Sequence, residues 1–278
     1  MSNLDTSAST LGKKTAASTQ TSSIRLLWAS ARLTSEIYAP LLARGTSRLI
    51  PLHLLEVGTG QFFLYATEYI QMTGRENLLM IAALAMLELT ISMLWSAAWI
   101  LAITDVADSI WRGRLRPVSF QSSLAHHYHQ LLIEQVRALA AVLWRIPLLI
   151  LPAFGEYIRL VFVPLVVILN GSYEQGETDA LQESRALCRG RFWMLTIFMS
   201  VSLGTPWFLQ SMIHGDSGEL LWENPIGVTF SSLMTLFINI FSSAFLWAVF
   251  RNLYPILKPT PQVDQDKTHD QSPTIVLS

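Results

Sequence analysis

Long apolar runs separated by short polar segments form the main pattern of this chain. The runs at residues 78–104, 192–213 and 228–250 are each long enough to supply the ~20 apolar residues that a helix needs to cross a bilayer. A fourth run, residues 131–169, is too long for a single crossing. We split it at Pro152 to Gly155, because proline ends helices and glycine tolerates turns, and we predict a hairpin of two helices there.

A weaker apolar run at residues 47–70 carries Glu56 and Glu68 and brings the count to about six crossings. Lys and Arg favour the cytoplasmic flanks of membrane spans. In this chain they gather before residue 49, at 112–116, at 185–191 and after residue 250, whereas residues 214–225 contain none. The sequence therefore predicts an all-α polytopic bundle of about six transmembrane helices. It places both termini in the cytoplasm, together with short amphipathic helices on that side.

The polar ends of the chain differ from this membrane domain, which we place at residues 47–254. Residues 1–23 contain almost no large apolar side chains, and residues 255–278 are proline-rich and polar, so we predict disordered N-terminal and C-terminal tails. Residues 24–46 place Ile24 and Trp28 on one helical face and arginines elsewhere. That pattern is typical of an amphipathic segment lying on a membrane surface.

Composition narrows the class of protein further. Hydrophobic residues make up 51% of the chain and charged residues only 14%, which departs from ordinary globular usage. The net charge of −1 provides no basic field to recruit nucleic acid. The single cysteine, Cys188, excludes an intrachain disulfide and a cysteine-based metal cluster. These features favour a membrane protein whose expected partners are the phospholipid bilayer and another membrane protein.

A short charged segment at residues 173–196 interrupts the apolar second half of the chain. Its apolar and small residues share one helical face, Asp179 stands at the N-cap position, and Gly190 permits a bend before the next crossing. We predict a cytoplasmic amphipathic helix whose arginines contact lipid headgroups. The predicted headgroup contacts are Arg112, Arg114, Arg116, Arg185, Arg189 and Arg191.

Residues 146–193 form a pattern of an apolar helix with a proline–glycine turn, a second helix with a proline step, a polar linker and a short helix that ends in glycine, arginine and tryptophan. Its positions are Pro152, Gly155, Pro164, Leu165, Ala180, Leu181, Ser184, Leu187, Gly190, Arg191 and Trp193. This pattern resembles the membrane domain that precedes some bacterial glycerophosphodiester phosphodiesterases, and stand-alone inner-membrane proteins of the YciC type. The acidic residue usual after the second helix is replaced by Asn170. The resemblance covers roughly residues 120–213. It implies a six-helix domain of the bacterial inner membrane without catalysis of its own.

Ionisable residues inside apolar runs are the first candidates for function. Glu88 lies near the middle of the strongest span, and it is interpreted either as a proton or cation relay, or a contact to a polar substrate, or as a protonated or hydrogen-bonded residue that joins two helices. Its candidate partners are Arg137, Arg145 and Arg159, of which we expect Arg145 to lie within the bilayer. Glu156 and Arg159 lie in the predicted hairpin turn, near the periplasmic interface, and their spacing of three allows them to pair on a helix.

Histidines 126, 127 and 129 form a second candidate cluster. His126 and His129 are spaced to share a helical face, but no acidic residue stands at ligand spacing. We therefore predict interfacial histidines rather than a metal site. Cys188 is interpreted as a packing residue, since no histidine base is near it in sequence. No catalytic residue, metal or cofactor is predicted.

Two functions follow as hypotheses. The leading one is a non-enzymatic inner-membrane protein that binds or organises phospholipids, or scaffolds a membrane assembly. The alternative is a small-solute or ion transporter that uses Glu88 and the intramembrane arginines. The sequence leaves the ligand, the protein partner and the oligomeric state open.

Overall fold

The computed structural model describes residues 5–72, 78–114, 119–145, 147, 150–214 and 224–257. These residues form helices, and no strand occurs among them, so the predicted all-α fold class is confirmed. The helices are α1 (Asp5–Met72), α2 (Leu78–Trp111), α3 (Phe120–Leu143), α4 (Ile150–Arg159), α5 (Val163–Leu169), α6 (Gly171–Glu174), α7 (Ala180–Cys188), α8 (Phe192–His214) and α9 (Pro225–Leu257).

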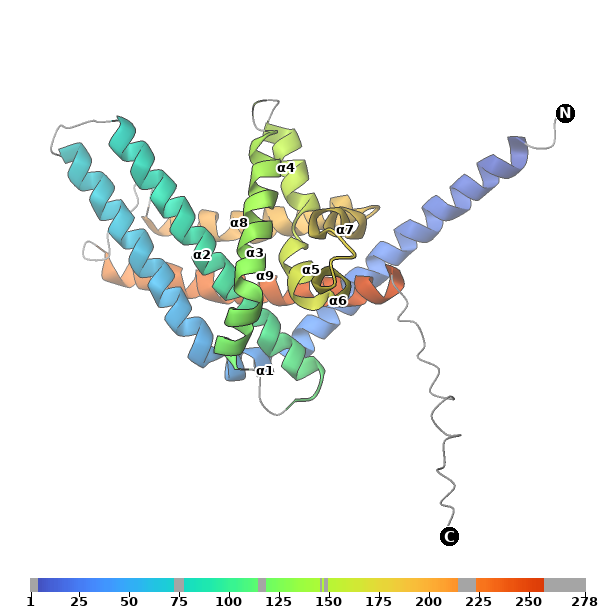
Figure 1. Ribbon diagram of the computed structural model, residues 1–278, viewed down its shortest axis with the longest axis horizontal. Helices are drawn as coiled ribbons and strands as arrows, with labels where there is room; N and C mark the ends of the chain where they lie inside the picture. Colours follow the sequence, from blue (N-terminus) through green and yellow to red (C-terminus); the bar gives the residue numbers. More distant parts are fainter. Residues whose placement is uncertain are drawn as a thin grey trace, which may run out of the picture.

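Figure 1 shows three helix pairs that cross one another at steep angles. The second half of α1 packs against α2, α3 packs against α4, and α8 packs against α9. Helix α9 also contacts α1 and α2, and its fully buried Trp247 and Phe250 lie in the main core. The short helices α5, α6 and α7 gather beside α3, where α5 adds the buried Phe162, its N-cap residue, to the same core.

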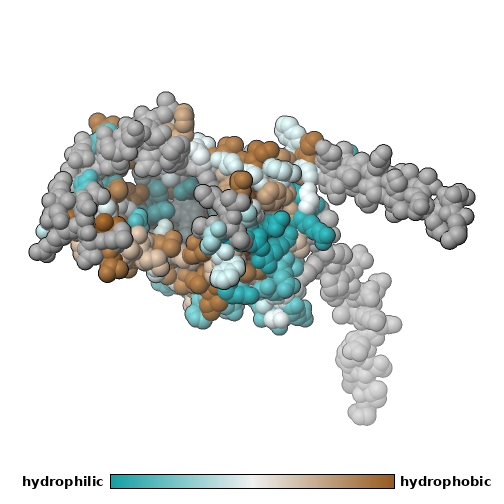
Figure 2. Space-filling model, turned by 90° about the horizontal axis from the view of Figure 1, so that it is seen from above, coloured by the Kyte–Doolittle hydropathy of each residue, from teal (hydrophilic) through white to brown (hydrophobic). Residues whose placement is uncertain are grey.

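Three apolar helical segments within the described ranges are long enough to cross a membrane: Leu79–Trp111, Leu151–Leu169 and Pro225–Tyr254. The first half of α2 is largely exposed, with Leu79 at 79% and Met86 at 63% of full exposure. In Figure 2, hydrophobic and hydrophilic residues gather in separate areas of the visible surface. Exposed apolar surface of this extent is typical of membrane proteins or large interfaces. The count of six crossings is not confirmed.

Helix α1 corrects the predicted division of the N-terminal region. Residues 5–23, predicted to be a disordered tail, and residues 24–46, predicted to be a separate segment, are both part of this single helix. Once a helix has formed, each residue that extends it gains one backbone hydrogen bond without a further nucleation cost, which favours continuation of a helix that is already packed. Pro40 and Pro51 lie inside α1, which changes direction near its middle in Figure 1.

The buried face of α1 also differs from the predicted apolar face. Ile24 and Trp28 are exposed, whereas Leu33, Ile37 and Leu41 are buried in the core. The sequence contains apolar residues on both faces, so periodicity alone did not select the one that packs. The exposed face stays compatible with a membrane surface.

The predicted hairpin exists, but its break lies earlier than predicted. Helix α3 ends at Leu143 and α4 begins at Ile150, so Pro152 and Gly155 lie within α4. Pro152 is in the first turn of α4, where its missing N–H is not needed for a helical hydrogen bond. Pro147 lies in the observed break instead, and a proline disfavours helical geometry in the residue before it.

The predicted amphipathic helix at residues 180–188 is confirmed as α7. Its buried residues are Ala180, Leu181, Ser184, Leu187 and Cys188, the predicted inner face. Gly190 follows with φ +77°, a left-handed conformation that glycine adopts without strain. Asp179 occupies the N-cap position, but its side chain makes no capping hydrogen bond and instead accepts one from Arg137.

Candidate functional site

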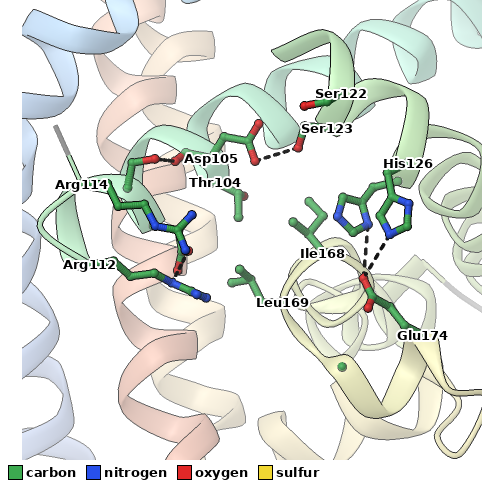
Figure 3. A pocket seen from close by; sticks show the side chains of 14 residues that line it. Thr104, Asp105, Arg112, Arg114, Ser122, Ser123, His126, Ile168, Leu169 and Glu174 are labelled. Atoms are coloured by element: carbon green, nitrogen blue, oxygen red, sulfur yellow. Dashed lines mark hydrogen bonds and ion pairs between the residues drawn. The ribbon is translucent and has the colours of Figure 1, made fainter. Parts of the chain in front are cut away.

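A polar cavity of about 600 Å³ lies between the end of α2, the start of α3 and the junction of α5 and α6 (Figure 3). We call it the α2–α3 pocket. Its volume lies in the range of ordinary ligand sites. The residues that line it are Thr104, Asp105, Asp108, Ser109, Arg112, Arg114, Ser122, Ser123, His126, His127, Ile168, Leu169, Gly171 and Glu174.

The end of α2 presents two arginines to this pocket. Gly113 has φ +64° and donates its N–H to the Ile110 carbonyl at 3.0 Å, while the Arg114 N–H donates to the Ser109 carbonyl at 2.9 Å. These two bonds form a Schellman motif, which satisfies the last carbonyls of a helix and favours glycine at the left-handed position. The motif fixes the backbone of Arg112 and Arg114 at the pocket.

Two aspartates on one face of α2 differ in the partners that their carboxylate oxygens have. Asp108 pairs with Arg112, whose Nε lies 2.6 Å from its Oδ2, and also pairs with Arg251 of α9. Asp105 accepts a hydrogen bond of 2.9 Å from the Ser123 hydroxyl through Oδ1. The other oxygen, Oδ2, is buried without a hydrogen-bond partner. Of the two aspartates, Asp105 is therefore the one that retains an unused acceptor atom.

The first turn of α3 forms the opposite wall. Ser119 is its N-cap residue but makes no side-chain capping bond, and the first turn carries no acidic residue. Ser122 and Ser123 of that turn line the pocket. Uncapped N–H groups and the positive end of the helix dipole favour an anion at such a position.

His126, His127 and Glu174 meet at the side of the pocket, where a ring nitrogen of each histidine lies within 3.8 Å of Glu174 Oε1. Figure 3 shows the ring of His126 directed at this carboxylate. The ligand atoms of the three residues lie within 4.8 Å of one another. Burial, and secondly the neighbouring His126, lower the pKa of His127. The sequence missed this trio because Glu174 comes from α6. The spacing argument had paired His126 with His129, which is not part of the cluster.

A second polar centre lies at Glu156, which is fully buried in α4. Its Oε2 is 2.6 Å from Arg145 Nη1 and 3.8 Å from Arg159 Nη1. Its Oε1 accepts two hydrogen bonds from Arg185 of α7, at 2.5 and 2.8 Å. The predicted pairing of Glu156 with Arg159 is present, although it is the longest of these contacts.

This Glu156 cluster corrects two predictions. Arg185, predicted to contact headgroups on the cytoplasmic side, instead binds a carboxylate that was predicted near the periplasmic side. A bilayer cannot separate two groups that share a hydrogen bond, so those two assignments are wrong as a pair. Arg145, proposed as the partner of Glu88, is also held by Glu156. Glu88 itself is exposed on α2.

Ser184 shows why the motif needs a small polar residue on the buried face of α7. Its hydroxyl donates to the Arg159 carbonyl at 2.8 Å and accepts from the Phe162 N–H at 3.2 Å. Both backbone groups belong to the corner between α4 and α5, where helical hydrogen bonds are interrupted. Buried backbone groups need such partners. Ser184 thus joins α7 to this corner.

The other motif positions are mainly structural. Pro164 stands in the first turn of α5, where proline is favoured, and Asn170 caps α6 by accepting the Ser172 N–H at 3.0 Å. Trp193 is 75% exposed at the start of α8.

The other arginines predicted as headgroup contacts differ in exposure. Arg189 is exposed and Arg191 half-buried. Arg116 lies outside the described residues.

Comparison with known proteins adds no relative: no protein-family model matches the chain, and neither does any curated protein or solved structure. The resemblance to the phosphodiesterase-associated membrane domain therefore stays a prediction. The described part of the chain is helical and contains three segments that are long and apolar enough to cross a membrane.

Proposed function

We propose that this chain is a non-enzymatic, multi-pass protein of the bacterial inner membrane that binds a phospholipid headgroup in the α2–α3 pocket. The observation that carries the proposal is the position of the pocket at the polar end of a candidate span. The first half of that span exposes apolar side chains, and among these Leu89 and Leu94 lie roughly 15–23 Å along the helix from the pocket residue Thr104, about the length of one lipid leaflet. A lipid lying along α2 with its tails on this surface brings its headgroup to the pocket end of the helix.

The phosphate of such a headgroup has partners on two sides of the pocket. Arg114 and Arg112 supply guanidinium groups, which bind phosphate oxygens well. The uncapped first turn of α3 supplies backbone N–H groups and the positive end of a helix dipole. The hydroxyls of Ser122 and Ser123 lie in the same turn.

The carboxylates of the pocket make a zwitterionic headgroup a better fit than a purely anionic one. Asp105 lines the pocket, and its partnerless Oδ2, which is buried in this conformation, becomes an acceptor for an ammonium group when the side chain turns towards the ligand. Asp108 is already paired with two arginines, and Glu174 faces two histidines, so Asp105 is the carboxylate that we assign to the ammonium group. We therefore assign the ligand to the phosphoethanolamine class, with phosphate towards Arg114 and ammonium towards Asp105.

Native mass spectrometry of the protein released from nanodiscs tests this proposal. Nanodiscs of phosphatidylethanolamine and phosphatidylglycerol are compared with nanodiscs in which phosphatidylcholine replaces phosphatidylethanolamine. We expect one retained phosphatidylethanolamine per chain, and a loss of ~10-fold in its affinity on Asp105→Asn, which removes a charged hydrogen-bond acceptor. The matched control is Glu177→Gln, which neutralises an exposed carboxylate outside the pocket.

Equal retention in wild type and Asp105→Asn would overturn the assignment of the ligand. Displacement of the bound species by inorganic phosphate would identify a site for a free anion instead. A reproducible protein partner without lipid would support a scaffold in place of a lipid-binding protein. The transporter hypothesis gains no support from the geometry, because Glu88 and Arg145 are not brought together.

A further inference from the structure

The three side chains His126, His127 and Glu174 form a cluster that the proposed lipid site does not use. His126 and His127 are consecutive on α3, so their side chains leave the helix about 100° apart. They still converge, because His126 presents its distal Nε2 and His127 its proximal Nδ1 to the same atom, Glu174 Oε1. The rings lie edge to face with centroids 4.6 Å apart.

The distances within this cluster are unusual for a hydrogen-bonded trio. His126 Nε2 lies 3.7 Å and His127 Nδ1 3.8 Å from the carboxylate oxygen, which is beyond hydrogen-bond length. His127 Nδ1 is also buried without a hydrogen-bond partner. Three atoms that are able to bind a metal ion, two imidazole nitrogens and one carboxylate oxygen, therefore lie close together. No direct hydrogen bond joins the two histidines to this carboxylate.

Those separations fit a metal ion between the three atoms. Zn²⁺ binds imidazole nitrogen and carboxylate oxygen at about 2.0–2.2 Å, and tetrahedral geometry then sets neighbouring ligand atoms roughly 3.3 Å apart. The two nitrogen-to-oxygen separations, 3.7 and 3.8 Å, exceed this by about half an ångström, and all three ligand atoms lie within 4.8 Å of one another. His126 and Glu174 are exposed, so their side chains are able to close that difference.

We propose that His126, His127 and Glu174 bind a divalent transition metal ion, with Zn²⁺ the best fit, at the side of the α2–α3 pocket. Two histidines and one glutamate form a ligand set that leaves a fourth position open. The open position faces the pocket that these residues line. This inference does not rest on the proposed lipid function, since it requires only the three ligands.

Zn²⁺ titration of the purified full-length protein tests the inference. Metal is first removed with a chelator, and binding is then measured by calorimetry and by metal analysis after gel filtration. We expect one Zn²⁺ per chain. We expect Zn²⁺ binding to weaken on the order of 100-fold in the double variant His126→Asn with His127→Gln, and also in the single variant Glu174→Gln. Each variant removes at least one side chain that binds the ion directly.

His129→Asn provides the matched control, because His129 is an exposed histidine on the same helix that lies outside the cluster. It should leave affinity and stoichiometry unchanged. Co²⁺ serves as a second probe, since a tetrahedral His and carboxylate site gives it intense visible absorption. Zn²⁺ binding that is equal in wild type and Glu174→Gln would overturn the site, as would a loss caused by His129→Asn alone. Glu174→Gln keeps the side-chain shape, so its unfolding temperature separates lost binding from lost folding.

Discussion

Replacing Glu156 by Gln tests the most densely charged contact in the described part of the molecule. The substitution preserves shape but removes the negative charge that Arg145, Arg159 and Arg185 share. Glu156 is fully buried, whereas the side chains of Arg145 and Arg185 keep 35% and 40% of their exposure. The arginines therefore regain water more easily than a buried charge would.

The expected cost follows from this asymmetry. Breaking a buried ion pair by removing one partner costs about 3–5 kcal/mol, and partial exposure of the arginines places this case near 3 kcal/mol. At roughly 2–4 °C per kcal/mol for chains of this size, the unfolding temperature should fall by about 6–12 °C. Arg185→Gln leaves Glu156 with Arg145, so its cost should be smaller, at about 1–2 kcal/mol.

Cys188 supplies the assay, since it is the single cysteine and is 1% exposed on α7. A thiol-reactive fluorogenic dye reports its exposure as the detergent-solubilised protein is heated. The control is Arg189→Gln, which alters an exposed arginine four positions along from Arg185. An unchanged unfolding temperature in Glu156→Gln would refute the reasoning, and so would equal effects of the two arginine variants.

Two further predictions concern α7. Ser184→Ala should destabilise the protein by about 1–3 kcal/mol, because it leaves the buried Phe162 N–H without its acceptor. Two variants serve as comparisons in the same thermal assay: Ser184→Thr, which keeps the hydroxyl, and Ser172→Ala, which changes a partly buried serine of α6. Burial raises the pKa of the Cys188 thiol from 9.0 to about 12. The unfolded chain therefore loses this proton first, and the stabilising contribution of the neutral thiol is present below pH 9 and declines between pH 9 and about 12. Denaturant unfolding should show a steeper alkaline loss of stability in wild type than in Cys188→Ala, and parallel curves would contradict the burial of this thiol.

The sequence by itself determined those features that depend on local pattern. The length of the apolar runs predicted the helices α2, α8 and α9, because a long continuous apolar segment is a helix signal that can be identified from the local sequence alone. The inner face of α7 and the bend at Gly190 followed from helical periodicity and from the freedom of glycine. Three serines of α9 make contacts with other helices, as small polar residues often do in helical bundles. Ser232 bonds His53, Ser242 bonds Ser202 and Ser243 accepts a bond from Trp99.

Tertiary structure alone decided which distant residues meet. Glu156 and Arg185 are 29 residues apart, and a topology based on counting charges placed them on opposite sides of a membrane. Glu174 joins His126 only because α6 folds back against the start of α3. Pairing of this kind depends on how helices cross. Crossing angles follow from the side-chain surfaces of two helices together, which no single stretch of sequence specifies.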